Sequence, residues 1–283
     1  MSLPHPVLKS GGAAEKNLIA LVRDTFNRLA CQTDLSPQNP VVNETLTRYV
    51  DTIIRADEVI ADKDAVLNDP AVRGLMDDMM RLLSRAEFAM EDHFAKLLSE
   101  GGKMPLSGLN RFWYRANYKA LVENEVDGIR NFAKDTHQDP RPMAFVGSGP
   151  LPLSAVDYYL LTGKSCVCIE MDEDAARNSR KLIENIGLDD VITVVQQDGR
   201  EADYSPYSMI FVAALVGNKD QVLDRIHDTA SHAMIGVRSA DGLKKLLYAQ
   251  VDIGSVEQRG FSHCGTTYGT PQAVNSTCFF QMK

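Results

Sequence analysis

The chain has 283 residues, 44% of them hydrophobic, so it is long enough to bury a large core in one or two domains. Its 30 Lys and Arg residues against 38 Asp and Glu residues give a net charge of −8, and no basic run is dense enough to attract nucleic acid or an anionic membrane. The apolar stretches fall short of the roughly 20 residues that span a bilayer, and the N-terminus lacks a signal-peptide pattern. We therefore expect a soluble, cytoplasmic protein with neither nucleic acid nor a membrane as partner.

The first half of the sequence predicts helices. From about residue 13 to 133 the apolar side chains recur at steps of three and four, as at Leu18, Leu21 and Val22. Breakers predict four to six helices, and they lie at residues 36–40, 69–70 and 100–105. A further break at 137–142 marks a predicted domain boundary. Residues 1–137 are expected to form a helical domain that serves as a lid and holds the acceptor substrate, and residues 138–283 are expected to form a second domain.

The second half alternates short β-rich runs with helical patterns. Helices are expected at 152–161 and 174–186, and strands at 143–146, 165–170, 191–196, 209–212 and 233–237. This alternation predicts parallel βαβ units, and hence an α/β fold with a Rossmann-like, doubly wound sheet of the methyltransferase type. Two further β-like runs, near 248–253 and 277–282, have no convincing helix between them, and we expect an antiparallel hairpin at the end of the sheet.

A glycine-rich turn joins the first predicted strand to the next helix. In Phe145-Val-Gly-Ser-Gly-Pro150 the glycines allow backbone N–H groups to approach a ligand at a helix N-terminus. Glu170 ends the second strand, 21 residues after Gly149, where a carboxylate can accept hydrogen bonds from ribose hydroxyls. Asp198 follows the third strand on the same sheet edge. The alternative is that Glu170 and Asp198 only cap helices.

The turn favours S-adenosylmethionine (SAM) over a dinucleotide. The third glycine of a dinucleotide fingerprint is replaced by Pro152, which blocks the close approach of helix and strand, so NAD and FAD are disfavoured. A single nucleoside that carries a carboxylate and a sulfonium suits the shorter turn. The end of the fourth strand, residues 209–215, lacks the acid, amide or aromatic groups of an ordinary methyl-acceptor site.

The helical half offers one candidate acid–base group. In the helix predicted over residues 84–98, Glu91 shares a stripe with Phe88, Ala95 and Leu98, which places a carboxylate on an otherwise apolar face. Burial disfavours the charged form of a carboxylate and suits it to accept a proton from an ammonium nucleophile. The alternative is a glutamate at the edge of a solvated face.

An aromatic segment follows at residues 112–118. Tyr114 and Tyr118 are expected on one helix face with Leu121 and Val122, and such stripes usually belong to a core. The segment also holds the only tryptophan of the chain, and aromatic faces stabilise a sulfonium as they stabilise an ammonium.

Four segments together resemble nicotianamine synthase: Phe145-Val-Gly-Ser-Gly-Pro-Leu-Pro-Leu153, Asn110-Arg-Phe-Trp-Tyr-Arg-Ala-Asn-Tyr118, Glu91-Asp-His-Phe94 and Val237-Arg-Ser-Ala-Asp-Gly242. The resemblance covers the chain from about residue 85 to 250. It extends to bacterial relatives that make opine-type metallophores of the staphylopine and pseudopaline kind. It implies an enzyme that transfers the 3-amino-3-carboxypropyl (2-aminobutanoyl) arm of SAM to an amine and releases methylthioadenosine, with no metal required.

The resemblance also implies roles for individual residues. Glu91 is expected to be the general base and Tyr118 to orient the amine or relay its proton, while Tyr114 and Arg238 contact the substrate. A structural ion pair is the alternative for Arg238. The residues expected to bind SAM are Gly147, Ser148, Gly149, Pro150, Leu151, Glu170 and Asp198. The family resemblance further suggests a homodimer.

Several alternatives remain open on the sequence. Our main expectation is an acceptor amino acid, with histidine preferred, as a step in staphylopine-like metallophore biosynthesis; the alternative is a nicotianamine synthase that condenses several SAM molecules. The preference rests on the absence of clear similarity to the plant enzymes before about residue 85. A SAM sensor and an ordinary N-methyltransferase are further options.

The five scattered cysteines fit a reducing compartment, and Cys166 and Cys168 are expected in the core, not on a metal.

Overall fold

The computed structural model describes residues 12–132, 139–230 and 232–283. The chain divides into two compact units: unit 1 is residues 1–89 with 241–249, and unit 2 is residues 90–240 with 250–283. This division differs from the predicted one at residue 137, because helix α6 (Arg115–Phe132) and the second half of helix α5 (Met76–Ser99) belong with the sheet. Residue 137 itself lies outside the described residues.

Unit 1 consists of helices. It comprises α1 (Ala13–Ala30), α2 (Pro40–Val59), α3 (Lys63–Leu67), α4 (Pro70–Arg73), the first part of α5 (Met76–Ser99) and η3 (Gly242–Leu246). The predicted breakers act as helix starts: the Asn39 side chain accepts from the Val41 N–H at 3.0 Å, and Asp69 accepts from the Ala71 N–H at 2.9 Å. Each cap is followed by a proline at the first helical position, where the missing N–H costs nothing. The predicted helical content is confirmed.

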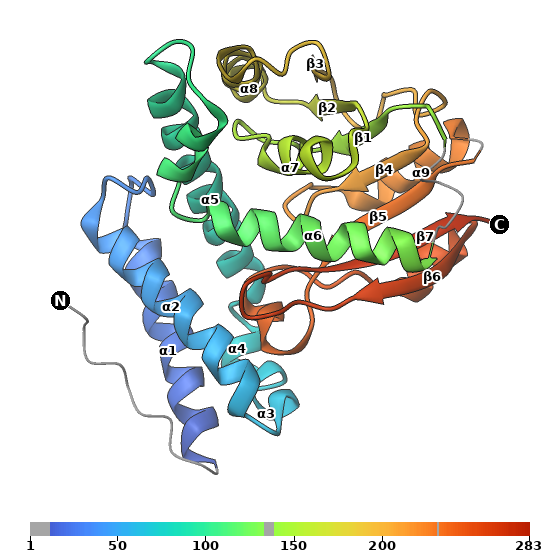
Figure 1. Ribbon diagram of the computed structural model, residues 1–283. Helices are drawn as coiled ribbons and strands as arrows, with labels where there is room; N and C mark the ends of the chain where they lie inside the picture. Colours follow the sequence, from blue (N-terminus) through green and yellow to red (C-terminus); the bar gives the residue numbers. More distant parts are fainter. Residues whose placement is uncertain (1–11, 133–138, 231) are drawn as a thin grey trace. The chain divides into compact units, whose positions relative to one another are not determined.

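Unit 2 is an α/β layered structure (Figure 1). In its described residues the strands form a seven-stranded sheet of order β3-β2-β1-β4-β5-β7-β6, in which β7 and β6 are antiparallel to the rest at one edge. The strands are β1 (Met143–Val146), β2 (Cys166–Glu170), β3 (Ile192–Gln196), β4 (Met209–Val212), β5 (Met234–Ser239), β6 (Phe261–Thr267) and β7 (Ser276–Met282). The helices are the rest of α5, η1 (Leu106–Arg111), α6 (Arg115–Phe132), α7 (Leu153–Thr162), α8 (Glu173–Ile186), α9 (Lys219–Thr229) and α10 (Ile253–Gln258).

The predicted Rossmann-like sheet is confirmed, and one part of the predicted hairpin is wrong. The strand expected near 248–253 is absent among the described residues, where Asp252 instead caps α10 by accepting from the Ser255 N–H at 3.2 Å. The hairpin partner of β7 is β6, and their pairing is interrupted between His263 and Gly265. The pairing is antiparallel, as expected, but it uses a different segment.

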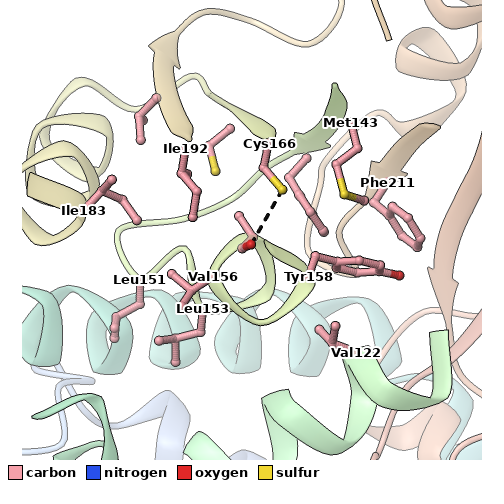
Figure 2. Packing of buried hydrophobic residues seen from close by; sticks show 14 of the residues in the cluster. Val122, Met143, Leu151, Leu153, Val156, Tyr158, Cys166, Ile183, Ile192 and Phe211 are labelled. Carbon is pink, nitrogen blue, oxygen red and sulfur yellow. Dashed lines mark hydrogen bonds between the residues drawn. The ribbon is translucent and has the colours of Figure 1, made fainter. Parts of the chain in front are cut away.

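The two faces of the sheet bury separate cores. One face packs against α6, α7, α8 and the second half of α5, and the other packs mainly against α9. Figure 2 shows the first core, where Val156 and Tyr158 of α7 face Cys166 and Phe211 of the strands. The thiol of Cys166 lies 3.6 Å from the carbonyl oxygen of Ala155. This packing fixes α7, and therefore the turn that precedes it, on the sheet.

An ion pair lies at the opposite, N-terminal end of β1. The Arg141 guanidinium donates to the Asp139 carboxylate at 2.7 Å, and the Arg141 backbone N–H donates to it at 2.9 Å. These bonds lower the pKa of Asp139 from 3.8 to about 2. A depressed carboxyl pKa contributes stability that is present above pH 4 and is lost as the pH falls through about 2.

We expect Asp139→Asn to lower the free energy of unfolding by about 1 kcal/mol at pH 6, since partial exposure screens the pair. Urea denaturation at pH 6 and pH 2 measures this difference. The difference between the variant and the parent chain should be smaller at pH 2, where Asp139 is half-protonated, and a difference as large as the one at pH 6 would contradict the assignment.

Candidate active site

The turn after β1 has the backbone shape that the sequence predicts. Gly147 and Gly149 adopt φ of +72° and +69°, in the left-handed region that side chains disfavour. The Gly147 N–H donates to the carbonyl of Ile169 at 2.9 Å, which continues the parallel ladder beyond the strand. Ser148 is half-buried, and Pro150 and Leu151 are buried. The turn lies beside the junction of β1 with β2 and β4, where sheets of this kind bind ligands.

Glu170 is buried and braces the turn. One carboxylate oxygen accepts from the Gly149 N–H at 2.8 Å and the other accepts from the Asp172 N–H at 3.0 Å. The cap of α8 is Asp172, which accepts from the Ala175 N–H at 2.8 Å. Glu170 therefore connects the turn with the segment before α8, and each of its oxygens retains a lone pair that can accept from a hydroxyl. Its contact with ribose stays a prediction.

Asp198 is engaged with a neighbour. Its carboxylate accepts from the Arg200 Nε at 3.0 Å and from the Arg200 backbone N–H at 2.9 Å. The Arg200 side chain and backbone donors lower the pKa of Asp198. The carboxylate therefore stays charged at neutral pH, and its proposed contact with SAM stays a prediction.

The central feature is a hydrogen bond between Tyr118 and Glu91. The Tyr118 hydroxyl donates to Oε1 of Glu91. The other carboxylate oxygen, Oε2, lies 2.6 Å from the position that a Cβ would take at Gly149. The structure thus brings the predicted base, the predicted orienting tyrosine and the predicted SAM-binding turn together.

The surroundings of Glu91 are less apolar than expected. Ala95 and Leu98 are buried, but Phe88 is 40% exposed, and Glu91 is half-buried at the border of the core. The stripe inferred from the helical period is therefore interrupted at Phe88. A half-buried carboxylate remains accessible to a substrate.

The aromatic segment is only partly helical. The helix α6 begins at Arg115, and Tyr114 precedes it, with its carbonyl accepting from the Tyr118 N–H at 3.2 Å. Phe112 is fully buried and lies 5.9 Å, centroid to centroid, from the Tyr118 ring, and 6.1 Å from that of Tyr114. Trp113 is 50% exposed. The Phe112 ring thus packs against both Tyr114 and the Tyr118 of the Glu91–Tyr118 pair. The contact of Tyr114 with the substrate stays a prediction.

Arg238 is held in a buried ion pair. Its Nε and a terminal nitrogen donate to Glu125 at 2.9 and 3.0 Å, and that terminal nitrogen also donates to Ser154 Oγ at 2.8 Å. Thr277 adds a hydrogen bond to Glu125 at 2.7 Å. Burial lowers the pKa of the Arg238 guanidinium, but Glu125, together with Tyr158 and Tyr118, raises it overall. The ion pair that was the alternative for Arg238 is present, while contact with a substrate carboxylate stays a prediction.

A second ion pair, between a largely buried arginine and a buried carboxylate, was missed from the sequence. Arg115, at the start of α6, forms a two-pronged ion pair with Asp157 of α7, whose side chain is 4% exposed. Burial raises the pKa of Asp157, and the Arg115 guanidinium opposes that rise. The signal was available for this pair, because Asp157 is the one charged residue in the apolar segment 150–162.

The segment after β4 closes over the turn. Val216 Cγ2 lies 2.4 Å from the position that a Cβ would take at Gly147. The Lys219 ammonium donates to the carbonyl of Val216 at 3.2 Å and to that of Ala214. Burial lowers the pKa of Lys219 to about 8. These contacts hold residues 213–218 against the glycine turn.

Within the described residues, no group of three or more His, Cys, Asp or Glu side chains is placed to hold a metal ion. Burial raises the pKa of Cys168 to about 12, so its thiol stays protonated in the core. No helix in the described part of the chain combines the length and apolarity needed to cross a bilayer.

The sheet order and the glycine turn define a class of protein, the Rossmann-like folds of the SAM-dependent methyltransferase type. The chain belongs to the nicotianamine synthase family, because the family model described as nicotianamine synthase protein matches residues 12–283. Nicotianamine synthase 2 of Arabidopsis thaliana is 28% identical over 278 residues, which cover 93% of this chain and 83% of the relative. Nicotianamine synthase of Solanum lycopersicum is 27% identical and covers 92% of this chain and 81% of the relative.

Solved structures have the same fold. The crystal structure of a single-site mutant of MtNAS in complex with S-adenosylmethionine matches with a TM-score of 0.78 and 22% identity, covering 93% of this chain and 97% of the other. MtNAS in complex with MTA and tNA matches with a TM-score of 0.77 and 22% identity, covering 95% and 97%.

The comparisons correct one inference from the sequence. The preference for histidine as acceptor rested on a lack of similarity to the plant enzymes before residue 85, but the family match begins at residue 12 and the Arabidopsis relative aligns with 93% of the chain. That ground is therefore removed. The named relatives favour the alternative, a nicotianamine synthase, over a histidine-specific transferase.

Proposed function

We propose that the chain is a nicotianamine synthase-type transferase that moves the 3-amino-3-carboxypropyl arm of SAM onto the amine of a second SAM-derived unit. The observation that carries the proposal is the hydrogen bond from Tyr118 to Glu91, directly over Gly149. A base lies there within reach of a ligand bound at the turn. Membership in the nicotianamine synthase family supports the same reaction.

The turn after β1 is suited to SAM as substrate. At Gly147 and Gly149 a side chain would collide with Val216 or Glu91, so the backbone is left bare where a nucleoside can approach it. Glu170 offers carboxylate oxygens at the end of the neighbouring strand, the position that suits ribose hydroxyls. The neighbouring structure crystallised with S-adenosylmethionine shares this fold.

The geometry supports a general-base mechanism. The amine lone pair forms a C–N bond to the methylene carbon next to the sulfonium while the C–S bond breaks, and sulfur keeps the electron pair as the neutral thioether of methylthioadenosine. The proton that the amine loses passes to the Glu91 carboxylate, which the Tyr118 hydroxyl holds in place. Only a neutral amine can attack, so this base is needed at neutral pH.

The purified chain should release methylthioadenosine from SAM alone, with a product that carries more than one aminocarboxypropyl unit. Chromatography coupled to mass spectrometry follows both products, with SAM alone and with L-histidine or D-histidine added. Release only with a histidine isomer would move the acceptor to that amino acid. S-adenosylhomocysteine as by-product, or no turnover under any condition, would overturn the proposal.

A further inference from the structure

The tyrosine of the site lies between two buried ion pairs that converge on one helix. Along α6, Arg115 precedes Tyr118 by three residues and Glu125 follows it by seven. At about 1.5 Å rise and 100° per residue, the side chains at these three positions project from the same side of the helix. Arg115 pairs with Asp157, and Glu125 pairs with Arg238.

Both pairs connect α6 with α7. Asp157 belongs to α7, and Arg238 donates to Ser154 one turn earlier on the same helix. Because α7 begins directly after the glycine turn, these bonds link the helix that carries Tyr118 with the segment expected to hold SAM (Figure 1). Glu125 is fully buried, and Asp157 and Arg238 are 4% and 8% exposed at their side chains.

Buried ion pairs such as these contribute little net free energy to the stability of a fold. Well-packed apolar residues often replace a buried ion pair at no loss of stability, so their presence in a core points to a need for defined geometry. A reacting geometry is sensitive to such positioning, since a misplacement of about 1 Å can lower a rate about 100-fold.

We propose that Arg115–Asp157 and Glu125–Arg238 act as positioning residues that hold the Tyr118 hydroxyl on Glu91 over the glycine turn. This inference rests on the proposed transfer reaction. It assigns Arg238 to the support of Tyr118 through Glu125, and it gives Asp157 and Arg115 a role in turnover although neither contacts the reacting atoms.

The test compares Arg115→Gln, Asp157→Asn and the double variant in the full chain. Each single change leaves one buried charge without its partner, so we expect kcat for methylthioadenosine release to fall about 30- to 100-fold. The Kd for SAM, measured by calorimetry, should change less than about threefold, because the glycine turn is unaltered. In the double variant the two side-chain amides can form a hydrogen bond with each other. Its kcat should therefore be at least about fivefold higher than that of the less active single variant.

Two further variants complete the design. Arg115→Lys keeps the buried positive charge but lacks the two parallel N–H donors of a guanidinium, and we expect its kcat to be about tenfold below the parent. This variant replaces Asp157→Asn in the test if Asp157→Asn does not fold. Glu125→Gln keeps shape and separates the two roles of Arg238. A positioning role lowers kcat about tenfold with KM unchanged, whereas a rise in KM with kcat unchanged would assign Arg238 to a substrate carboxylate and overturn its positioning role.

The matched control is Asp139→Asn, which breaks an ion pair at the opposite end of the parallel strands. It should lose stability and keep kcat. Folded single variants with parental kcat, or a control that loses kcat in the same proportion, would overturn the inference. Absence of methylthioadenosine from the parent chain would instead overturn the proposed function, so the two failures are distinguishable.

Discussion

Glu91→Gln should lower kcat for methylthioadenosine release by roughly 10²- to 10⁴-fold, the contribution that a general base makes. The amide keeps the size of the side chain and can still accept from Tyr118, but it cannot take a proton from the attacking amine. The Kd for SAM should stay within about threefold of the parent value. Single-turnover assays and calorimetry measure the two quantities separately.

The adjacent carboxylate supplies the control for this variant. Asp92 lies on the same helix, accepts from Lys96 at 2.5 Å and from Asn178 at 2.9 Å, and takes no part in the Glu91–Tyr118 hydrogen bond. Asp92→Asn should therefore retain turnover. A Glu91→Gln variant that keeps more than a tenth of the parental kcat would remove Glu91 from the role of base.

Gly149→Ala should lower methylthioadenosine release at least about 100-fold, because it acts on two features of the site at once. Its φ of +69° is strained for alanine, and the added methyl group would lie 2.6 Å from Oε2 of Glu91. Either the turn or the Glu91 carboxylate must move. Turnover at saturating SAM and the Kd for SAM together show which of them does.

Gly163 separates backbone strain from collision. It has a φ of +71°, at the end of α7, and a Cβ there would meet nothing within 4 Å. Gly163→Ala should cost about 1–2 kcal/mol of stability and leave kcat unchanged. Equal losses of kcat in the two alanine variants would show that strain alone, not the contact with Glu91, explains the effect at Gly149.

The parallel strands were predictable because their apolar sequences reflect their burial on both faces of the sheet. The bounds of β1 and β4 match the prediction to the residue, since each is a short apolar run buried on both faces and bounded by breaks. The strand β6 was missed because Ser262, His263 and Gly265 hide its alternation. A Cβ at Gly265 would lie 2.4 Å from the ring of Phe132. A glycine is therefore required there by a tertiary contact that the local sequence does not reveal.

The candidate site was predictable in its parts but not in its connections. Periodicity singled out Glu91, and the turn singled out Gly149, but that the two meet follows only from how α5 packs in unit 2. The ion pairs join residues 42 and 113 positions apart, so no local pattern could pair them. The family resemblance supplied the roles of Glu91 and Tyr118, which remain predictions until the variants are assayed.

The place of β7 in the sheet sets the order in which the site can be completed. This strand follows all the others in sequence, yet it lies between β5 and β6 and supplies Thr277 to Glu125. During synthesis β5 therefore remains an unpaired edge, open to association with other chains, until the segment from Ser276 to Met282 has left the ribosome. The hydrogen bond from Thr277 to Glu125 can form only once β7 has joined the sheet, so the surroundings of the Glu125–Arg238 pair are completed after the five parallel strands have paired.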